Sequence, residues 1–439
     1  MVPSSDSSPA TPERVGIIGQ GYVGLPLALL FARKGISAVG FDLDEAKVAA
    51  LNAGKSFIRY IADDTISDLI SQGLYRASSN FDEFADVDAL IICVPTPLNK
   101  YAQPDISFIQ SAGREIAKRL NKGQLVVLES TTYPGCTKQD LLPILEESGL
   151  KHDVDFWLAF SPEREDPANA QFKTDNIPKL VGGLTPAATR KALDLYQKAV
   201  EKVVPVDSAE VAEAAKLLEN IFRSVNIALV NEMKIVFDRM GVDVWKVVDA
   251  ARTKPFGFMP FYPGPGLGGH CIPIDPFYLT WKAKEYGLHT RFIELAGEIN
   301  TEMPTFVVSR VSTALNHHSK PVKGSRILIV GLAYKANVED TRESPAFAVI
   351  SKLRTQGGDV SYFDPYVPES LLAHELGHGE MLPRVEWNAE SLANFDAAVI
   401  VTNHSGVDYT VLAAACPCIV DTRNALSGVE CREGQLWKA

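Results

Sequence analysis

One local pattern near the start of the chain limits the folds that this sequence can adopt. A short apolar run over residues 14–19 leads into Gly-Gln-Gly-Tyr-Val-Gly, and a helix-like stretch over 25–33 precedes a second apolar run over 38–42. A strand, a glycine turn, a helix and a second strand within roughly thirty residues form a βαβ unit. Because parallel neighbours need a helical crossover, this unit predicts a parallel sheet covered by helices.

Further apolar runs over residues 89–94, 125–129 and 157–160 alternate with helical stretches. Such alternation is typical of a doubly wound parallel sheet, so the predicted fold class is α/β.

The glycine turn has the spacing of a dinucleotide-binding fingerprint, formed by Gly19, Gly21 and Gly24. In such a Rossmann unit the first glycine makes the turn, the second admits a pyrophosphate at the helix N-terminus, and the third allows close helix–strand packing. Asp42 ends the second strand, where it would accept hydrogen bonds from the ribose hydroxyls and repel a 2′-phosphate. NAD is therefore expected rather than NADP, and a purely structural glycine turn is the alternative.

The same pattern returns later in the chain. Residues 326–331 repeat residues 14–19, a helical stretch opens at 344, and a strand over 360–364 ends in Phe-Asp as the earlier one does. The second copy keeps Gly331 but replaces the rest of the fingerprint with Lys335 and the segment Asp340-Thr-Arg-Glu-Ser-Pro, which contains Arg342. We expect a second Rossmann-like domain that receives an anionic ligand rather than a dinucleotide held in the same way.

Residues 209–240 follow helical periodicity without an internal glycine or proline, and a further helical run is expected over 276–318. A helix of the first length can span a domain junction, build a dimer interface, or pack inside one domain.

Charge and cysteine content exclude several classes of function. The formal net charge of -11 argues against nucleic-acid binding, and the six cysteines show no spacing typical of zinc sites or disulfide frameworks. Residues 1–13 resemble a disordered tail rather than a signal peptide, and no run is long enough to cross a membrane. A cytoplasmic protein without a metal or a membrane partner is expected.

A cysteine in a glycine-rich segment is the strongest candidate for chemistry. Cys271 follows Gly268 and Gly269, and Pro273 and Asp275 come just after it. Proline favours a helix start, and the positive end of a helix dipole favours the nucleophilic thiolate. Asp275 could order a water near the sulfur. A buried cysteine in a glycine-rich turn is the alternative.

Other polar residues lie where ligands bind in such folds. Lys216 and Asn220 share one face of the long helix and could hold an oxyanion, or could simply face solvent. Glu163 follows a strand end and could be a general base, or a capping or surface residue. The hydroxyls of Thr96, Ser130 and Thr131 could reach a cofactor or water, or could cap backbone groups.

Together these residues resemble the nucleotide-sugar 6-dehydrogenase family, over roughly residues 14–423. The matching motifs are GQGYVG at Gly19, VPTP at Val94, EST at Glu129, SPER at Ser161, EAAKLLEN at Glu213, GGHCIPIDP at Gly268 and GLAYKANVEDTRESP at Gly331. The resemblance implies an NAD-binding domain over 14–206, a connecting and dimerisation region over 207–320 that carries the catalytic lysine and cysteine, and a UDP-sugar-binding domain over 321–439. It also implies a homodimer or a higher homo-oligomer.

The resemblance further implies a four-electron oxidation at C6 of a UDP-sugar. The alcohol loses hydride to NAD, Cys271 traps the aldehyde as a thiohemiacetal, a second NAD takes another hydride, and the thioester is hydrolysed. Lys216 and Asn220 would stabilise oxyanions, Asp275 would orient water or assist proton transfer, and Glu163 with Thr131 would handle the water. The group that removes the first proton stays open.

The family's binding residues carry over by position. The expected cofactor residues are Gly19, Gln20, Gly21, Tyr22, Val23, Gly24, Asp42, Lys47, Pro95, Thr96, Ser130, Thr131 and Arg342. The expected UDP-sugar residues are Glu163, Arg164, Lys216, Asn220, Arg252, Tyr262, Gly264, Gly266, Gly268, Lys335 and Arg423, with Arg252 reaching across a dimer.

Departures from the UDP-glucose enzymes bear on the sugar. His270 and Ile274 stand where those enzymes typically have serine and lysine, Pro167 stands where they have a second glutamate, and the 254–265 stretch is longer. The segment resembles the UDP-N-acetylglucosamine 6-dehydrogenases of surface-polysaccharide pathways. UDP-GlcNAc is therefore favoured, followed by UDP-GalNAc and then by UDP-glucose or UDP-ManNAc.

Two other classes of function stay open from the residues alone. A two-electron hydroxyacid dehydrogenase would share the first domain and a lysine but would need no cysteine. A non-catalytic sensor of NAD or of nucleotides would release no NADH.

Overall fold

The computed structural model describes residues 14–439 except 59, 100, 102, 165–174, 270–271, 370–371 and 373–381. The expected disordered tail over 1–13 lies outside the described residues, as do Cys271, His270 and Pro167. The chain forms two compact units: one contains the residues up to Glu219 with Phe277–Leu288, and the other contains Asn220–Pro276 with His289–Ala439. The domain boundaries suggested by the sequence stay a prediction.

The first unit is built on a sheet with the strand order β3-β2-β1-β4-β5-β6-β7-β8, and β7 is antiparallel to β6. Its strands are β1 (Arg14–Ile18), β2 (Ser37–Phe41), β3 (Tyr75–Ser78), β4 (Ala89–Ile92), β5 (Leu125–Leu128), β6 (Trp157–Phe160), β7 (Lys179–Gly183) and β8 (Val203–Pro205). Its helices are α1 (Gly24–Arg33), α2 (Glu45–Asn52), α3 (Asp63–Ser71), α4 (Ser107–Ala117), α5 (Leu142–Glu146) and α6 (Pro186–Tyr196), with a 3₁₀ helix over Phe81–Asp86 and a π-helical turn over Thr137–Leu141.

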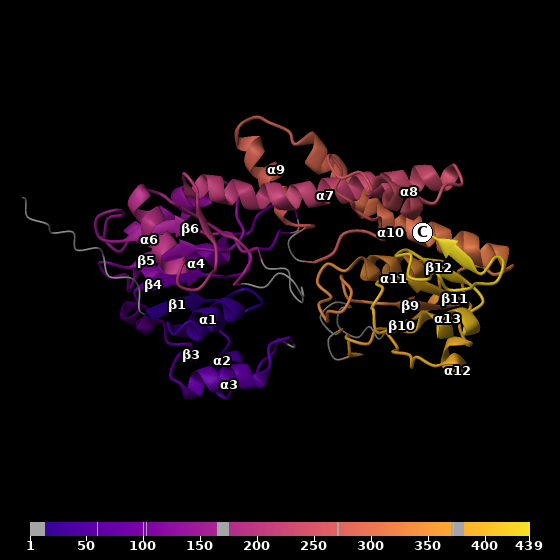
Figure 1. Ribbon diagram of the computed structural model, residues 1–439, viewed down its shortest axis with the longest axis horizontal. Helices are drawn as coiled ribbons and strands as arrows, with labels where there is room; N and C mark the ends of the chain where they lie inside the picture. The colour runs from indigo at the N-terminus through magenta and orange to yellow at the C-terminus, as the bar shows by residue number, and fades with distance from the viewer. Residues whose placement is uncertain are drawn as a thin grey trace, which may run out of the picture. The chain divides into compact units, whose positions relative to one another are not determined.

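Alternation along the central strands explains why both faces of this sheet are covered. In β4, Ala89 and Ile91 belong to a core shared with α1 and α6, whereas Leu90 and Ile92 belong to a core shared with α4 and α5. Successive side chains of a strand point to opposite faces, so apolar runs like these need helices on both sides. At one edge, α2 and α3 lie beside β3 (Figure 1).

The second unit contains an all-parallel sheet in the order β10-β9-β11-β12-β13. Its strands are β9 (Arg326–Val330), β10 (Asp359–Phe363), β11 (Ala397–Ile400), β12 (Ile419–Asp421) and β13 (Leu436–Lys438). Its helices are α8 (Val244–Ala251), α10 (Arg291–His317), α11 (Pro345–Thr355), α12 (Ala389–Leu392) and α13 (Tyr409–Ala415). Helices α7 (Ala209–Arg239) and α9 (Asp275–Glu285) each contribute residues to both units.

The internal repeat is present in the structure. A parallel bridge between Tyr362 and Arg384 extends the second sheet beyond β10, so its strand order matches that of β3 to β6 in the first sheet. The turn glycines match too: the N–H of Gly19 donates to Phe41 and that of Gly331 to Phe363, each at 2.8 Å. The α/β class and the two Rossmann-like sheets are confirmed.

Helix α7 confirms the long helix that periodicity predicts, but the single helical run expected over 276–318 is wrong. Two helices occupy it, because the chain turns at Gly287, whose φ is +69°. The N–H of Leu288 donates to the Ala283 carbonyl at 3.1 Å and that of Gly287 to Lys284 at 3.0 Å. This pattern closes a helix with a left-handed glycine. In the described part of the chain, no helix combines the length and apolarity needed to cross a membrane.

Candidate active site

The glycine turn of the first unit has the geometry that a bound dinucleotide requires. Gly19 has φ +91°, and a Cβ there would lie 2.6 Å from the Cys93 carbonyl oxygen. A Cβ on Gly24 would lie 1.9 Å from the Gly19 oxygen, so only glycine allows α1 to pack this closely. A Cβ on Gly21 would meet nothing within 4 Å, which leaves space where a pyrophosphate would approach the N-terminus of α1. The residues present therefore fit NAD.

Asp42 lies just beyond β2 and is held in place from several sides. Its carboxylate accepts hydrogen bonds at 2.9 Å from the Gln20 backbone and the Lys47 ammonium, and at 3.0 Å from the Asp44 backbone. Lys47 and Asp42 thus come together as the sequence predicts. The side chain of Gln20 points inward instead, where it bonds Tyr75 and the Ile17 carbonyl, so only its backbone can serve a ligand.

Among the three hydroxyl residues predicted at the strand ends, Ser130 bonds the backbone. Ser130 donates to the Val94 carbonyl at 2.8 Å, which ties the end of β5 to the end of β4. Thr96 is buried, and its carbonyl accepts from the Tyr278 hydroxyl at 2.9 Å. Thr131 comes three residues after Leu128 and is half-buried. Tyr22 and Val23 pack partly against the core, and Pro95 is exposed.

Charged side chains gather where β5, β6 and β7 meet. Lys179 opens β7, and its ammonium lies 3.0 Å from Glu129 and 3.4 Å from Glu163. Glu129 is fully buried and also accepts a hydrogen bond from the Tyr196 hydroxyl. Glu163 is held at its other oxygen by the Arg164 backbone at 2.7 Å, and its carbonyl accepts from the Lys216 ammonium. Three predicted site residues are therefore neighbours in the first unit.

Burial sets the electrostatics of this group. Desolvation raises the pKa of Glu129 to about 7, although the Lys179 cation opposes the shift. Burial works to lower the pKa of Lys179, but Glu129 and Glu163 together outweigh it and raise that pKa. Arg164 pairs with Glu219 and donates to the Pro178 carbonyl at 2.8 Å, which fastens the segment before Lys179.

Asn220 and Asp275 come together in the second unit. The Asn220 amide donates to the Asp275 carboxylate at 2.5 Å, and both side chains are buried. Asn220 lies one turn beyond Lys216 on α7, and Asp275 is the first residue of α9. The structure thus pairs two residues that the sequence places 55 positions apart.

The glycine-rich loop before Cys271 is anchored by buried amides. The Gly264 N–H donates to Asn231 at 2.9 Å, Asn231 donates to Asn300 at 2.9 Å, and Asn300 donates to the Ser224 carbonyl at 3.2 Å. Gly266 has φ +140°, and a Cβ on Gly268 would lie 2.8 Å from the Cβ of Tyr334. Glycine is therefore required for the loop to lie this close to the chain around Tyr334.

Arg423 lies directly behind this loop. A Cβ on Gly264 would lie 2.5 Å from its Nη1 atom, so a larger residue there would displace the guanidinium. The Nε–H donates to the Val401 carbonyl at 2.8 Å, and in the described part of the chain no carboxylate pairs with the guanidinium. Burial lowers the pKa of Arg423 to about 10, against the attraction of Asp421. A largely buried cation of this kind is suited to an anionic ligand.

The second copy of the fingerprint is closed to a dinucleotide. Asp364, the counterpart of Asp42, has no exposed surface and bonds the backbone N–H groups of Leu332 and Ala333 and the ring of His404. The other ring nitrogen of His404 accepts from the Asn337 N–H at 2.9 Å, so Nε2 carries the proton. Asp364 has no free position for a ribose, which explains the altered ligand expected from the sequence.

The other predicted residues of the second unit are placed as follows. Arg342 forms a bidentate pair with Asp340, at 2.9 Å and 2.6 Å, and its carbonyl accepts from the Gly269 N–H. Lys335, which lies between Gly331 and Asp340 in the sequence, is half-buried. Tyr262 stacks on Trp245 at 5.2 Å and accepts from Arg252 at 3.2 Å. Arg252 is exposed.

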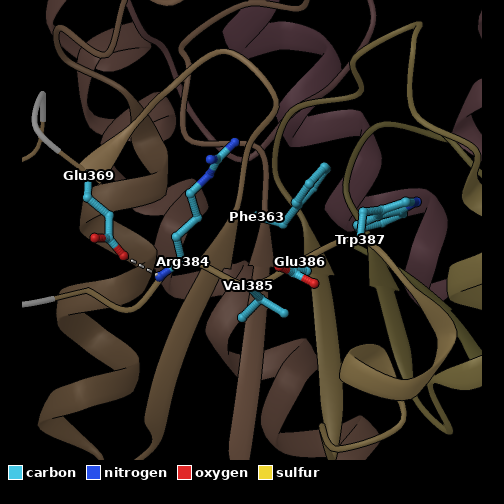
Figure 2. A pocket seen from close by; sticks show the side chains of 6 residues that line it. All are labelled: Phe363, Glu369, Arg384, Val385, Glu386 and Trp387. Atoms are coloured by element: carbon cyan, nitrogen blue, oxygen red, sulfur yellow. Dashed lines mark hydrogen bonds between the residues drawn. The ribbon is translucent and has the colours of Figure 1, made fainter.

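A cavity of about 520 Å³ opens at the carboxyl end of β10 (Figure 2). In this view Glu369 accepts a hydrogen bond from the backbone of Arg384, while Phe363 lies against Trp387 with 4.4 Å between ring centres. None of the predicted site residues lines it. Its lining carries two carboxylates, Glu369 and Glu386, against one guanidinium, Arg384, so we do not assign the diphosphate to this cavity.

Sequence reasoning missed the residues that hold the site together. Lys179, Tyr196 and Asn231 were not identified, and Glu129 and Glu213 were noted only as members of motifs. Glu213 accepts from the backbone of Gly135 at 2.6 Å and of Thr137 at 2.9 Å. A lysine directly before the apolar run Leu-Val-Gly-Gly was a usable signal, because a charge at the start of a buried strand needs a partner.

Comparisons with known proteins agree with these features. Three consecutive segments match the UDP-glucose/GDP-mannose dehydrogenase family: its NAD binding domain over residues 13–200, its central domain over 210–302 and its UDP binding domain over 328–428. Among relatives, the chain is 38% identical to a UDP-N-acetyl-D-glucosamine 6-dehydrogenase of Pseudomonas aeruginosa, over 83% of this chain and 85% of that protein.

Two further proteins show the range of sugars. A UDP-N-acetyl-D-glucosamine 6-dehydrogenase of Salmonella typhi is 35% identical, over 89% of this chain and 90% of that protein. The solved structure of a UDP-D-ManNAc dehydrogenase from Pyrococcus horikoshii superposes with a TM-score of 0.85 at 31% identity, and the match covers 97% of this chain and 98% of that one.

Proposed function

Because this chain belongs to the UDP-glucose/GDP-mannose dehydrogenase family, and is thus an NAD-dependent UDP-sugar dehydrogenase, we propose that it oxidises C6 of a UDP-N-acetylhexosamine to a uronate. UDP-GlcNAc is the favoured substrate, and UDP-GalNAc, UDP-glucose and UDP-ManNAc follow. The role we propose is in surface polysaccharide biosynthesis.

The contact between Asn220 and Asp275 carries this proposal. Asp275 comes four residues after Cys271 in the sequence, and its buried carboxylate is held by the Asn220 amide. A simple two-electron dehydrogenase has no use for a thiol followed by a fixed carboxylate. A cysteine that forms a thioester does, because water must later attack that thioester.

The proposed steps divide among the residues of this chain. Bound NAD would supply the hydride acceptor for each of two oxidations. Cys271 adds to the aldehyde carbon as the oxygen takes a proton, and loss of the second hydride turns this thiohemiacetal into a thioester. Lys216 and Asn220 stabilise the oxyanions, Asp275 orients the water, and Glu163 with Thr131 handles its protons.

We propose binding roles that the contacts described above support. Asp42 and Lys47 would meet the adenosine ribose, and the turn from Gly19 to Gly24 would meet the pyrophosphate, with Thr96 and Ser130 nearby in the same strand-end region. For the UDP-sugar, Arg423 would meet the diphosphate, with Lys335 and the Tyr262–Gly268 loop. Arg342 would lie near cofactor phosphate, and Arg164 would support the sugar side through its neighbour Glu163.

We also propose that the protein is a homodimer built on α7. Phe222, Leu229, Val236 and Met240 are between 42% and 66% exposed, and their spacing of seven, seven and four residues puts them on one helical face. An exposed apolar stripe of this kind marks an interaction site, and the repeat suits a second copy of the helix. Light scattering of Leu229→Glu should show monomers where the wild type shows dimers, and an unchanged mass would reject this interface.

The NADH yield tests the reaction. Purified enzyme is incubated to completion with excess NAD and a limiting amount of each UDP-sugar. Two NADH per UDP-GlcNAc are expected, with UDP-GlcNAc ahead of the others in kcat/KM. One NADH would indicate a two-electron dehydrogenase and none would indicate a sensor. A preference for UDP-glucose would overturn the sugar assignment alone.

A further inference from the structure

Lys179 is a charged residue whose side chain is buried in the first unit. It opens β7, its side chain is 7% exposed, and its ammonium contacts Glu129 and Glu163, which lie after β5 and near the end of β6. The Tyr196 ring from α6 lies 5.3 Å from the ammonium. A charge in such a place is costly unless it is paired, so the two carboxylates explain why it can be buried.

The two carboxylates beside Lys179 differ in their burial and in their distance from the ammonium. Glu129 is fully buried and bonds both Lys179 and Tyr196, so it neutralises the lysine inside the protein. Glu163 is 15% exposed and lies at 3.4 Å, which is an electrostatic contact rather than a tight hydrogen bond. Glu129 therefore has a structural role, whereas Glu163 is the carboxylate proposed to accept a proton from the water.

Other groups near Glu163 are two cations and a buried thiol. Lys216 on α7 bonds its carbonyl, the Arg164 guanidinium is engaged by Glu219, and the buried Cys93 thiol lies near enough to Glu163 and Glu129 for both to raise the pKa of Cys93. Lys179 is the cation whose ammonium contacts the Glu163 carboxylate at the distance given above. Removing Lys179 would therefore take away a positive charge that lies beside the Glu163 carboxylate.

We infer that Lys179 is a positioning residue for Glu163: its ammonium keeps that carboxylate ionised and oriented to deprotonate the water that hydrolyses the thioester. The inference rests on the proposed function. In that step the water oxygen bonds to the thioester carbon, the carbon–sulfur bond breaks and the sulfur leaves as thiolate. Glu163 takes one water proton, and the second is released when the uronic acid ionises.

The proposed role of Lys179 affects one step of the reaction, the hydrolysis of the thioester. The two hydride transfers precede water attack, so they should be insensitive to the charge on Glu163. Loss of the lysine should slow hydrolysis alone, because an opposite charge within about 4–6 Å lowers a carboxyl pKa by roughly 1–3 units. Hydrolysis of the thioester should then reach its full rate only at a higher pH.

The test separates NADH formation from uronate release in Lys179→Met, with the UDP-sugar that wild-type enzyme oxidises fastest. Rapid-quench experiments from pH 5.5 to 9 should show NADH formation within about threefold of wild type. Uronate release at pH 7 should fall at least tenfold, with its acidic limb moved up by about 1–2 pH units. Lys179→Arg should return the acidic limb of the pH profile to its wild-type position. Lys191→Met is the matched control, because Lys191 lies over the Trp157 ring instead, at 3.8 Å.

A double variant guards against loss of folding. Glu129→Gln with Lys179→Met removes the buried carboxylate together with its partner and should show the same pH shift. Equal slowing of both steps, an unmoved acidic limb, or failure of both variants to fold would overturn the inference. If wild-type enzyme itself forms fewer than two NADH, the proposed function fails instead.

Discussion

Replacing Arg423 with methionine should weaken UDP binding while making the unliganded protein more stable. Burial lowers the pKa of Arg423 to about 10, so the buried charge costs on the order of 3 kcal/mol. Methionine keeps the apolar stem and removes the charge. It also strands the Val401 carbonyl, which costs about 1–2 kcal/mol. The net expectation is a gain of about 1–2 kcal/mol in unfolding free energy.

The same change should cost UDP most of its affinity. Leaving a buried charge without its partner costs roughly 3–5 kcal/mol, which corresponds to a Kd increase on the order of several hundred-fold. Urea unfolding measures the stability, and calorimetric titration with UDP measures the affinity. Arg432→Met is the control, because Arg432 is exposed and the described hydrogen bond of its guanidinium is to the Cys416 carbonyl. A variant that loses stability and binds UDP normally would refute the reasoning.

Two further predictions follow from the first unit. Asp42→Ser should leave the Lys47 ammonium facing the ribose, so the preference for NAD over NADP should fall at least about tenfold in kcat/KM, and an unchanged preference would show that Asp42 does not meet the ribose. Burial raises the folded pKa of Glu213 to about 7, so the folded chain binds a proton that the unfolded chain loses near pH 4.5, and stability should fall as the pH rises from about 5 to 8. Glu213→Gln cannot titrate and should show a shallower slope in urea unfolding across this range, whereas a slope equal to wild type would contradict the assignment.

Local signals explain why so much of the fold could be predicted. The strand–glycine–helix unit, the long α7 and the repeat at Arg326 depend on residues close in sequence, and all are present. The break between α9 and α10 was missed, although Tyr286-Gly287-Leu288 offered a turn signal, because apolar periodicity on both sides hid it.

The candidate site was less predictable, since its contacts join distant parts of the chain. The sequence identifies Asp364 as a likeness of Asp42, but only the structure shows that His404, forty positions away, occupies its carboxylate. In the same way, Lys179 and Glu129 are 50 positions apart, and no sequence motif contains both residues. Charge pairing of this kind depends on tertiary packing rather than on local pattern.

A trapped intermediate on Cys271 would test the central claim most directly. Wild-type enzyme is quenched with acid during turnover of UDP-GlcNAc and NAD, and the protein is analysed by peptide mass spectrometry. We expect a uronyl adduct on the peptide that contains Cys271, and none in Cys271→Ser, whose turnover should fall by several orders of magnitude because serine is a far weaker nucleophile at neutral pH. A Cys271→Ser enzyme that forms two NADH per sugar at near wild-type rate, with no adduct on the wild type, would contradict the account.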